Sequence, residues 1–230
     1  MTEQEVSFVN IQNKWIKYTS SNSCCVNKCF DKINTTNKKC LNGNGFINII
    51  DDENIKYINC VEGKGYNKTA FIYCENSFNK PKEDSINYFL FYFEIKCIIE
   101  HDEIWFDFGL KNEDGGEVIL EAKNTYIRNE NSRRYRLPPT FSWNDGDVFG
   151  CGLVYPPNNK INELPYVFFT QNGKQIGKAT LFKNDYDSYK PYIYQQSCSL
   201  EANFGNDLNK PFIYDIKKHR VLTEFYVSKR

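Results

Sequence analysis

Three consecutive segments decide the fold of this chain: GDVFGCGLVY (146–155), VFFTQNGKQIGKA (167–179) and LEANFG (200–205). Each contains the apolar residues of a buried strand, and turn residues separate them. In the middle segment Asn172-Gly173 stands between two strand-like stretches, and Asn-Gly is the dipeptide that best adopts the two positive φ angles of a type I′ turn. The pattern predicts a two-residue hairpin in which Phe169 lies opposite Ile176.

Alternation of apolar and polar residues extends this strand pattern outward. Every odd position from 89 to 99 is apolar and 104–108 repeats the pattern, so the link 100–103 is predicted to be the tight turn of a meander. Segments 46–50 and 55–60 predict another hairpin. Short strands separated by turns must bury one face each, which predicts an all-β protein, a bent β-sandwich of two antiparallel sheets. The residues expected in its core are Phe91, Phe93, Phe106, Phe108, Phe149, Leu153, Phe169 and Phe204.

The overall composition limits the class of partner. The 230 residues suit one β-domain, and the net charge of +0 gives no field that favours nucleic acid or an anionic membrane. The N-terminus lacks the apolar core of a signal peptide, and no segment approaches a transmembrane helix. The nine cysteines are predicted to be mostly reduced and buried. We therefore expect a soluble cytoplasmic protein, with secretion into a host cell only if a leader is missing.

Six segments, taken in order, resemble the SPRY domain: YFEIK (92–96), FGL (108–110), GDVFGC (146–151), FFTQNG (168–173), ANFG (202–205) and PFIYDI (211–216). The resemblance covers about residues 55 to 216 and is nearest to Ran-binding-type SPRY domains. The cysteine-rich lead-in also resembles the expanded, partly secreted SPRY families of plant-parasitic nematodes. The resemblance implies a concanavalin-like jelly-roll architecture, with a lead-in packed on the domain at 1–45, the SPRY domain at 46–216 and a C-terminal extension at 217–230.

The resemblance implies a monomer that binds a short peptide or a protein surface through loops at one end of the sandwich, as an adaptor or a parasite effector, without catalysis or cofactor. By position, its binding loops fall on 61–69, 124–136 and 194–198. Tyrosine and arginine suit such contacts, although these loops could instead be merely solvated. The residues expected to bind the partner are Tyr66, Asn67, Tyr126, Arg128, Arg133 and Gln195. Where the peptide-binding SOCS-box relatives have a Trp, this chain has Gln195 or its neighbour, which puts their Asn-rich ligand in doubt.

An enzyme is not expected from the inventory of side chains. The two histidines, His101 and His219, have no neighbouring nucleophile and orienting group in the sequence. Glu103 and Asp107 could pair as in a glycosidase sandwich, but a turn acid and a solvent-facing acid are the favoured interpretation. The alternative function is that of a carbohydrate-binding β-sandwich, because jelly-roll lectins share this architecture.

Four cysteines in the lead-in, Cys24, Cys25, Cys29 and Cys40, leave three states open. They could hold a structural Zn²⁺, but paired CxxC knuckles are missing and vicinal cysteines rarely bind one ion together. They could form a disulfide, or they could be buried or loop thiols. Simple thiols are the leading expectation, so no metal site is predicted.

Overall fold

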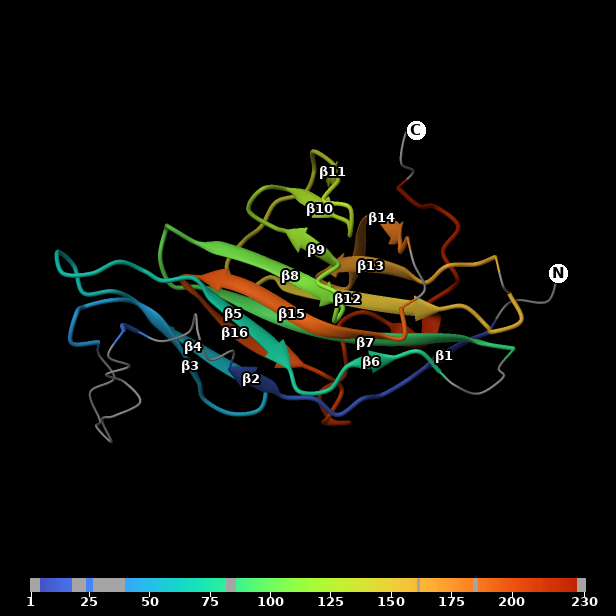
Figure 1. Ribbon diagram of the computed structural model, residues 1–230, viewed down its shortest axis with the longest axis horizontal. Coiled ribbons are helices and arrows are strands. Elements are labelled where there is room, and N and C mark those ends of the chain that lie inside the picture. Colours follow the sequence, from blue (N-terminus) through green and yellow to red (C-terminus); the bar gives the residue numbers. More distant parts are fainter. Residues whose placement is uncertain are drawn as a thin grey trace.

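The computed structural model describes residues 5–17, 24–26, 40–81, 86–160, 162–183 and 186–226, and these form a sandwich of two eight-stranded sheets (Figure 1). We call the first the β7 sheet. Its order is β14 (Lys174–Leu181), β13 (Tyr166–Gln171), β12 (Val148–Tyr155), β7 (Tyr88–Ile99), β16 (Cys198–Asn203), β4 (Asn54–Ile58) and β3 (Phe46–Ile49), with β1 (Val6–Phe8) also paired to β7.

The second sheet, the β8 sheet, lies against the first. Its order is β11 (Arg134–Arg136), β10 (Tyr126–Arg128), β9 (Glu117–Glu121), β8 (Trp105–Lys111), β15 (Ser188–Gln196), β5 (Ala70–Cys74) and β2 (Trp15–Lys17), with β6 (Phe78–Asn79) also paired to β15. All pairs are antiparallel except β1 with β7, which run parallel. One 3-10 turn, Ile216–Lys218, follows the last strand. The predicted all-β fold of two antiparallel sheets is confirmed.

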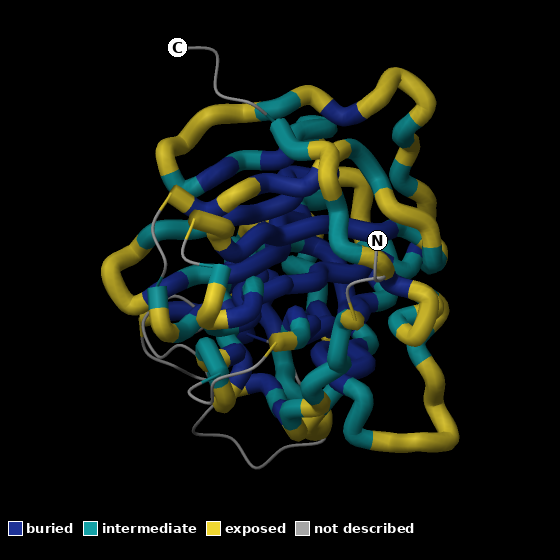
Figure 2. The backbone as a smooth tube through the Cα atoms, turned by 90° about the vertical axis from the view of Figure 1, so that its right-hand side faces the viewer, coloured by how far each residue is buried: buried dark blue, intermediate teal, exposed yellow. Residues whose placement is uncertain are grey.

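The core between the sheets contains the residues expected from the alternation. All eight predicted core residues are at most 2% exposed, and Figure 2 shows the buried strands as a continuous inner layer. The predicted hairpin is also present, since Asn172 and Gly173 have φ of 49° and 76° and Phe169 lies opposite Ile176. The hairpin of β3 and β4 is confirmed as well.

The predicted meander between residues 89 and 108 is wrong. β7 pairs with β12 and β16, whereas β8 pairs with β9 and β15, so the link 100–103 crosses from one sheet to the other. The physical reason is that strands in the two sheets of a sandwich show the same alternation, because both turn apolar residues toward one shared core. Alternation therefore identifies a strand but not its sheet.

The outer face of the β7 sheet is covered by the chain itself. Phe212, Tyr214, Val221, Leu222 and Phe225 pack on a second apolar cluster that includes Tyr92 and Phe168. Glu94, which is 3% exposed, accepts hydrogen bonds from the backbone N–H groups of Ile213 (2.9 Å) and Tyr214 (2.8 Å). This carboxylate therefore fixes the C-terminal segment across the sheet, and β7 is buried on both faces.

The terminal parts contribute to the sandwich at its margins. β1 and β2, from the predicted lead-in, join one sheet each, and Phe225 forms a bridge with Ala179 beside β13. The domain boundaries at residues 45 and 216 remain predictions. In the described part of the chain there is no helix long and apolar enough to cross a membrane.

Candidate functional site

The outer side of the β8 sheet differs from that of the β7 sheet, because no described segment crosses in front of β5, β15 and β8 (Figure 1). Residues directly opposite one another on paired strands share a face of the sheet. Those that point away from the core form the β8 outer face, in four cross-strand rows: Gln196 and Trp105; Phe71, Tyr194, Asp107, Glu121, Tyr126 and Arg136; Ile16, Tyr73, Tyr192, Gly109, Ile119, Arg128 and Arg134; Lys190, Lys111 and Glu117.

One half of the β8 outer face is aromatic. The ring centroids of Phe71 and Tyr194 lie 4.7 Å apart, and those of Tyr73 and Tyr192 lie 5.1 Å apart. Trp105 meets the Tyr194 ring edge to face at 6.3 Å. All of these rings except that of Tyr192 are partly exposed. A cluster of rigid rings on the solvent side of a sheet offers contact area at low cost in side-chain entropy.

Asp107 lies at the inner border of this aromatic half and is only 6% exposed. Its Oδ2 accepts a hydrogen bond of 2.8 Å from the indole N–H of Trp105, whereas its Oδ1 is buried with no partner among the described residues. Burial raises the pKa of Asp107 to about 7, with the Trp105 hydrogen bond opposing the rise and the negative charge of Glu121 adding to it. The prediction of a solvent-facing acid is wrong, because the neighbouring strands place Tyr194 on one side of it and Glu121 on the other.

The other half of the face is a network of charges. Glu121 is 2% exposed and accepts hydrogen bonds from Nε of Arg128 (2.7 Å) and Nε of Arg134 (2.8 Å). Arg128 also contacts Glu117 at 2.7 Å. Burial lowers the pKa of Arg128, but its hydrogen bonds with Glu117 and Glu121 raise it by more. The buried carboxylate of Glu121 thus connects β9 with β10 and β11. Removing one partner would leave a buried charge uncompensated, which disfavours any other register.

A hollow of about 480 Å³ continues the face toward β2. Its lining comprises Ile16, Tyr73, Ser77, Lys111, Asn112, Glu113, Ser188 and Lys190. Two lysines thus lie beside the aromatic cluster, and Nζ of Lys111 sits 5.4 Å from the centre of the Tyr192 ring. The face as a whole can offer stacking area, a buried acceptor that lacks a donor, and cationic groups at one end.

Two of the six predicted partner-binding residues lie on the β8 outer face. Tyr126 is partly exposed opposite Glu121, and Arg128 lies in the next row, with its Nε and one terminal nitrogen already engaged by carboxylates. Gln195 lies on β15, but its side chain points into the core and is 0% exposed. Its Nε2 has no partner among the described residues.

The other three lie elsewhere. Tyr66 is 64% exposed and belongs to the segment between β4 and β5. This segment lies at the left end of Figure 1, whereas β10 and β11 lie at the top of that figure. Asn67 is 8% exposed and its side-chain oxygen accepts a hydrogen bond from the N–H of Cys60. Arg133 is exposed in the turn between β10 and β11. The binding role of all six residues remains a prediction.

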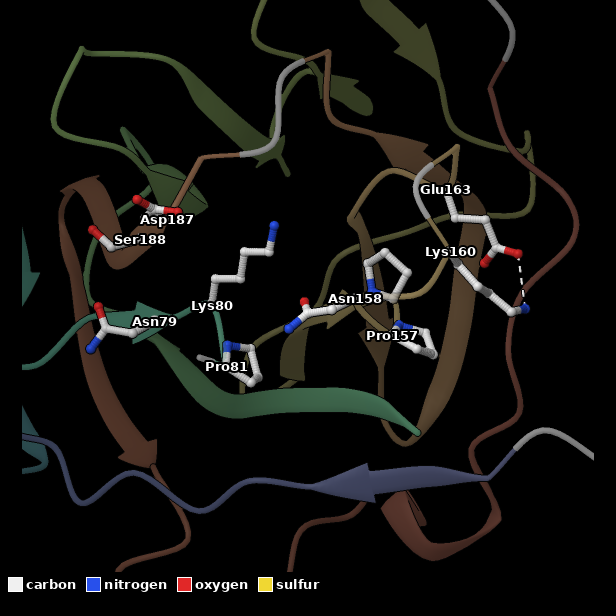
Figure 3. A pocket seen from close by; sticks show the side chains of 10 residues that line it. Asn79, Lys80, Pro81, Pro157, Asn158, Lys160, Glu163, Asp187 and Ser188 are labelled. Carbon is white, nitrogen blue, oxygen red and sulfur yellow. Dashed lines mark hydrogen bonds and ion pairs between the residues drawn. The ribbon is translucent and has the colours of Figure 1, made fainter. Parts of the chain in front are cut away.

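Another hollow, of about 790 Å³, lies where the segments after β6 and β12 meet (Figure 3). Lys160 and Glu163 form an ion pair of 2.9 Å on one wall, and Lys80 projects into the opening. Pro81, Pro156 and Pro157 form much of the rest of its described lining, which includes none of the predicted binding residues. Lys160 and Glu163 in this hollow already form an ion pair with each other, whereas Asp107 has a buried oxygen with no partner among the described residues.

The histidines lie apart from these surfaces. His101 is exposed in the link between β7 and β8. His219 is 3% exposed, stacks on Phe168 at 4.6 Å and contacts the hydroxyls of Tyr166 (3.3 Å) and Tyr214 (2.8 Å). Burial lowers the pKa of His219 to about 4, so its neutral ring is part of the apolar cluster. The burial of His219 and its stacking on Phe168 give it a structural role in this apolar cluster.

Comparison with known proteins finds several similar solved structures. A human SPRY domain is among the similar solved structures. It is 17% identical, matches 70% of this chain and 96% of its own, and has a TM-score of 0.46. The carbohydrate recognition domain of Emp46p, in metal-free form, is 9% identical over 70% of this chain and 86% of its own, with a TM-score of 0.41; that of Emp47p is 12% identical over 81% and 94%, with a TM-score of 0.39.

No family model matches the chain, and no curated protein matches it. The similar solved structures thus include one SPRY domain and two carbohydrate recognition domains. Likenesses this distant do not transfer a ligand, so the β8 outer face has to be judged by its own chemistry.

Sequence reasoning missed this face although its signal was present. Tyr192 and Tyr194 alternate with inward residues, as do Phe71 and Tyr73, which marks both pairs as outward aromatic residues. What the sequence did not show is that β5, β15 and β8 are neighbours, so that the pairs meet each other and Trp105.

Proposed function

We propose that this protein is a non-enzymatic interaction module that binds a short segment of another protein on the β8 outer face. The observation that carries the proposal is the buried Oδ1 of Asp107, which has no donor among the described residues, next to the partly exposed rings of Trp105 and Tyr194. A buried acceptor without a donor costs about 1–3 kcal/mol, and a ligand that brings an N–H group recovers this free energy.

The surface specifies the ligand's chemistry. A lysine, arginine or backbone N–H of the partner would donate to Asp107, and an apolar or aromatic side chain would pack on Phe71 and Tyr194. Lys111 and Lys190, at the hollow, favour a carboxylate a few residues along the ligand. An extended peptide offers these groups in sequence, which a free metabolite of similar size does not.

Carbohydrate binding is the second candidate. Sugars stack on aromatic rings and donate hydroxyl hydrogen bonds to carboxylates, and the Trp105 indole lies beside the Asp107 carboxyl, with a hydrogen bond of 2.8 Å between them. A glycan array decides between the two: binding to a defined glycan that competes with protein capture favours the lectin, and no glycan binding favours the protein ligand.

The experiment is affinity capture from a lysate with the intact chain and three variants. Tyr194→Ala should reduce capture at least ~30-fold, the effect of losing about 2 kcal/mol at a central anchor. Leu208→Ala, a matched loss of an apolar group that is 92% exposed, should leave capture unchanged. Tyr66→Ala tests the loop predicted from the family resemblance. If Tyr194→Ala still captures the partner and Tyr66→Ala does not, the partner binds at the loops and not on the β8 outer face.

A further inference from the structure

Three cysteines from two separate segments converge beside β3. Cys24, Cys25 and Cys40 are 1%, 3% and 6% exposed and pack with Phe46 and Ile58 in a small cluster of their own. Their sulfur atoms all lie within 4.8 Å of one another. Cys29, the fourth cysteine of the lead-in, lies outside the described residues and is not part of this argument.

The spacing of the sulfurs is that of ligands around one ion. Two thiolates bound to a tetrahedral Zn²⁺ at about 2.3 Å lie about 3.8 Å apart, whereas a disulfide brings its sulfurs to about 2.0 Å. The Sγ atoms of Cys24 and Cys25 are 3.8 Å apart. The vicinal pair, which the sequence alone disfavours as a joint ligand set, therefore has the spacing of two ligands of one ion, and Sγ of Cys40 lies within 4.8 Å of both sulfurs.

One hydrogen bond joins the two segments, and another shapes the turn after Cys40. The side-chain amide of Asn44 donates to the backbone oxygen of Cys24 (2.9 Å), and the N–H of Gly43 donates to the oxygen of Cys40 (2.9 Å). Gly43 has a φ of +75°, so the backbone reverses directly after Cys40 at a position that favours glycine. The cluster is thus anchored to the edge of the β7 sheet through the turn that leads into β3.

We propose that Cys24, Cys25 and Cys40 bind one structural Zn²⁺ through three thiolates. Zn²⁺ suits the set because it takes sulfur ligands tetrahedrally and has no redox chemistry of its own. Each thiol loses its proton to solvent on binding, so binding strengthens as pH rises. A water molecule or another donor completes the fourth position.

The ion would also support one of the predicted binding loops. Asn44, which holds Cys24, accepts a hydrogen bond from the N–H of Tyr66 (3.3 Å), and Gly45 donates to the oxygen of Tyr66 (3.0 Å). Metal binding at the cysteines therefore stabilises the backbone on which Tyr66 stands. This consequence does not depend on the β8 outer face.

The test uses the full chain, purified with a phosphine reductant and without chelator. Metal analysis should find about one zinc per chain, and Co²⁺ exchanged into the site should show thiolate charge-transfer absorption and the intense visible bands of tetrahedral coordination. Each of three variants, Cys24→Ser, Cys25→Ser and Cys40→Ser, should weaken Zn²⁺ binding by at least ~10-fold. Replacing a residue that only hydrogen-bonds to a ligand already causes a loss of this size. Cys60→Ser, a nearby cysteine outside the cluster, is the matched control.

Two results would overturn the proposal. One is a folded, reduced wild-type chain that takes up neither Zn²⁺ nor Co²⁺ with thiolate absorption. The other is a mass lower by two hydrogens that maps to a disulfide within the cluster in wild-type chain isolated in parallel without reductant, with its free thiols alkylated at lysis. Because both are read on the wild-type chain, a serine variant that fails to fold does not prevent the decision.

Discussion

Replacing Asp107 with asparagine should make the protein more stable above neutral pH while it removes partner binding. The folded-state pKa of Asp107 is raised from 3.8 to about 7. A raised carboxyl pKa means that the folded state holds a proton which the unfolded state releases, so the group's contribution is fully present below pH 3.8 and is lost as pH rises through 7. At 1.36 kcal/mol per pH unit, the free energy of unfolding falls by about 4 kcal/mol across this window.

Asparagine at position 107 carries no charge at any of these pH values, and its carbonyl can still accept the 2.8 Å hydrogen bond from Trp105. The difference in free energy of unfolding between Asp107→Asn and the wild type should therefore be near zero at pH 4 and reach about 4 kcal/mol in favour of the variant at pH 8. Urea denaturation at half-unit intervals of pH, with equal m-values in both chains, measures it.

The difference between the two chains cancels the titration of other groups. A difference that stays constant from pH 4 to pH 8 would refute the argument, because it would mean that the Asp107 carboxyl titrates at its ordinary pKa and is not desolvated. A variant that is stabilised at pH 8 and yet fails to capture the partner identifies Asp107 as a residue kept for binding at a cost in stability.

Three further outcomes are expected. Phe93→Ala should lower the free energy of unfolding by ~3–5 kcal/mol in urea denaturation, because Phe93 is 0% exposed among other rings; a melting temperature within a degree or two of wild type would contradict this. Gly173→Val should cost on the order of 1–3 kcal/mol because φ is +76° there, whereas Lys174→Val, the neighbouring control, should cost much less; equal losses would remove the turn from the explanation. His219 has a pKa lowered from 6.5 to about 4, so the wild type should lose about 3 kcal/mol as pH falls from 6.5 to 4, and His219→Gln should lack this loss relative to wild type; parallel pH profiles would show that the ring is protonated in the fold.

Local features of the fold were predictable from the sequence, and long-range ones were not. Asn172-Gly173 fixes its turn through backbone conformation alone, and the alternation around Phe93 and Phe108 fixes which side chains face the core. The link 100–103 was assigned to the wrong connection because inward alternation is the same in both sheets.

The candidate site shows the same limit. The resemblance to SPRY domains points to Tyr126 and Arg128, and both lie on the β8 outer face. Asp107 was read as a solvated acid because its burial comes from Tyr194 and Glu121, which reach it only through cross-strand pairing. Sequence periodicity gives the side of a strand on which a residue lies, but the neighbours on that side depend on strand order.

Site-specific photo-crosslinking tests the central proposal most directly. A benzophenone amino acid is placed at Tyr194 on the β8 outer face, at Tyr66 in the predicted loop and at Leu208 as the exposed control, and each chain is irradiated in lysate. The account predicts a discrete protein adduct from position 194 that disappears when Asp107→Asn is added, with none from position 208. An adduct from position 66 alone, or one at 194 that survives Asp107→Asn at full yield, would contradict binding through the β8 outer face.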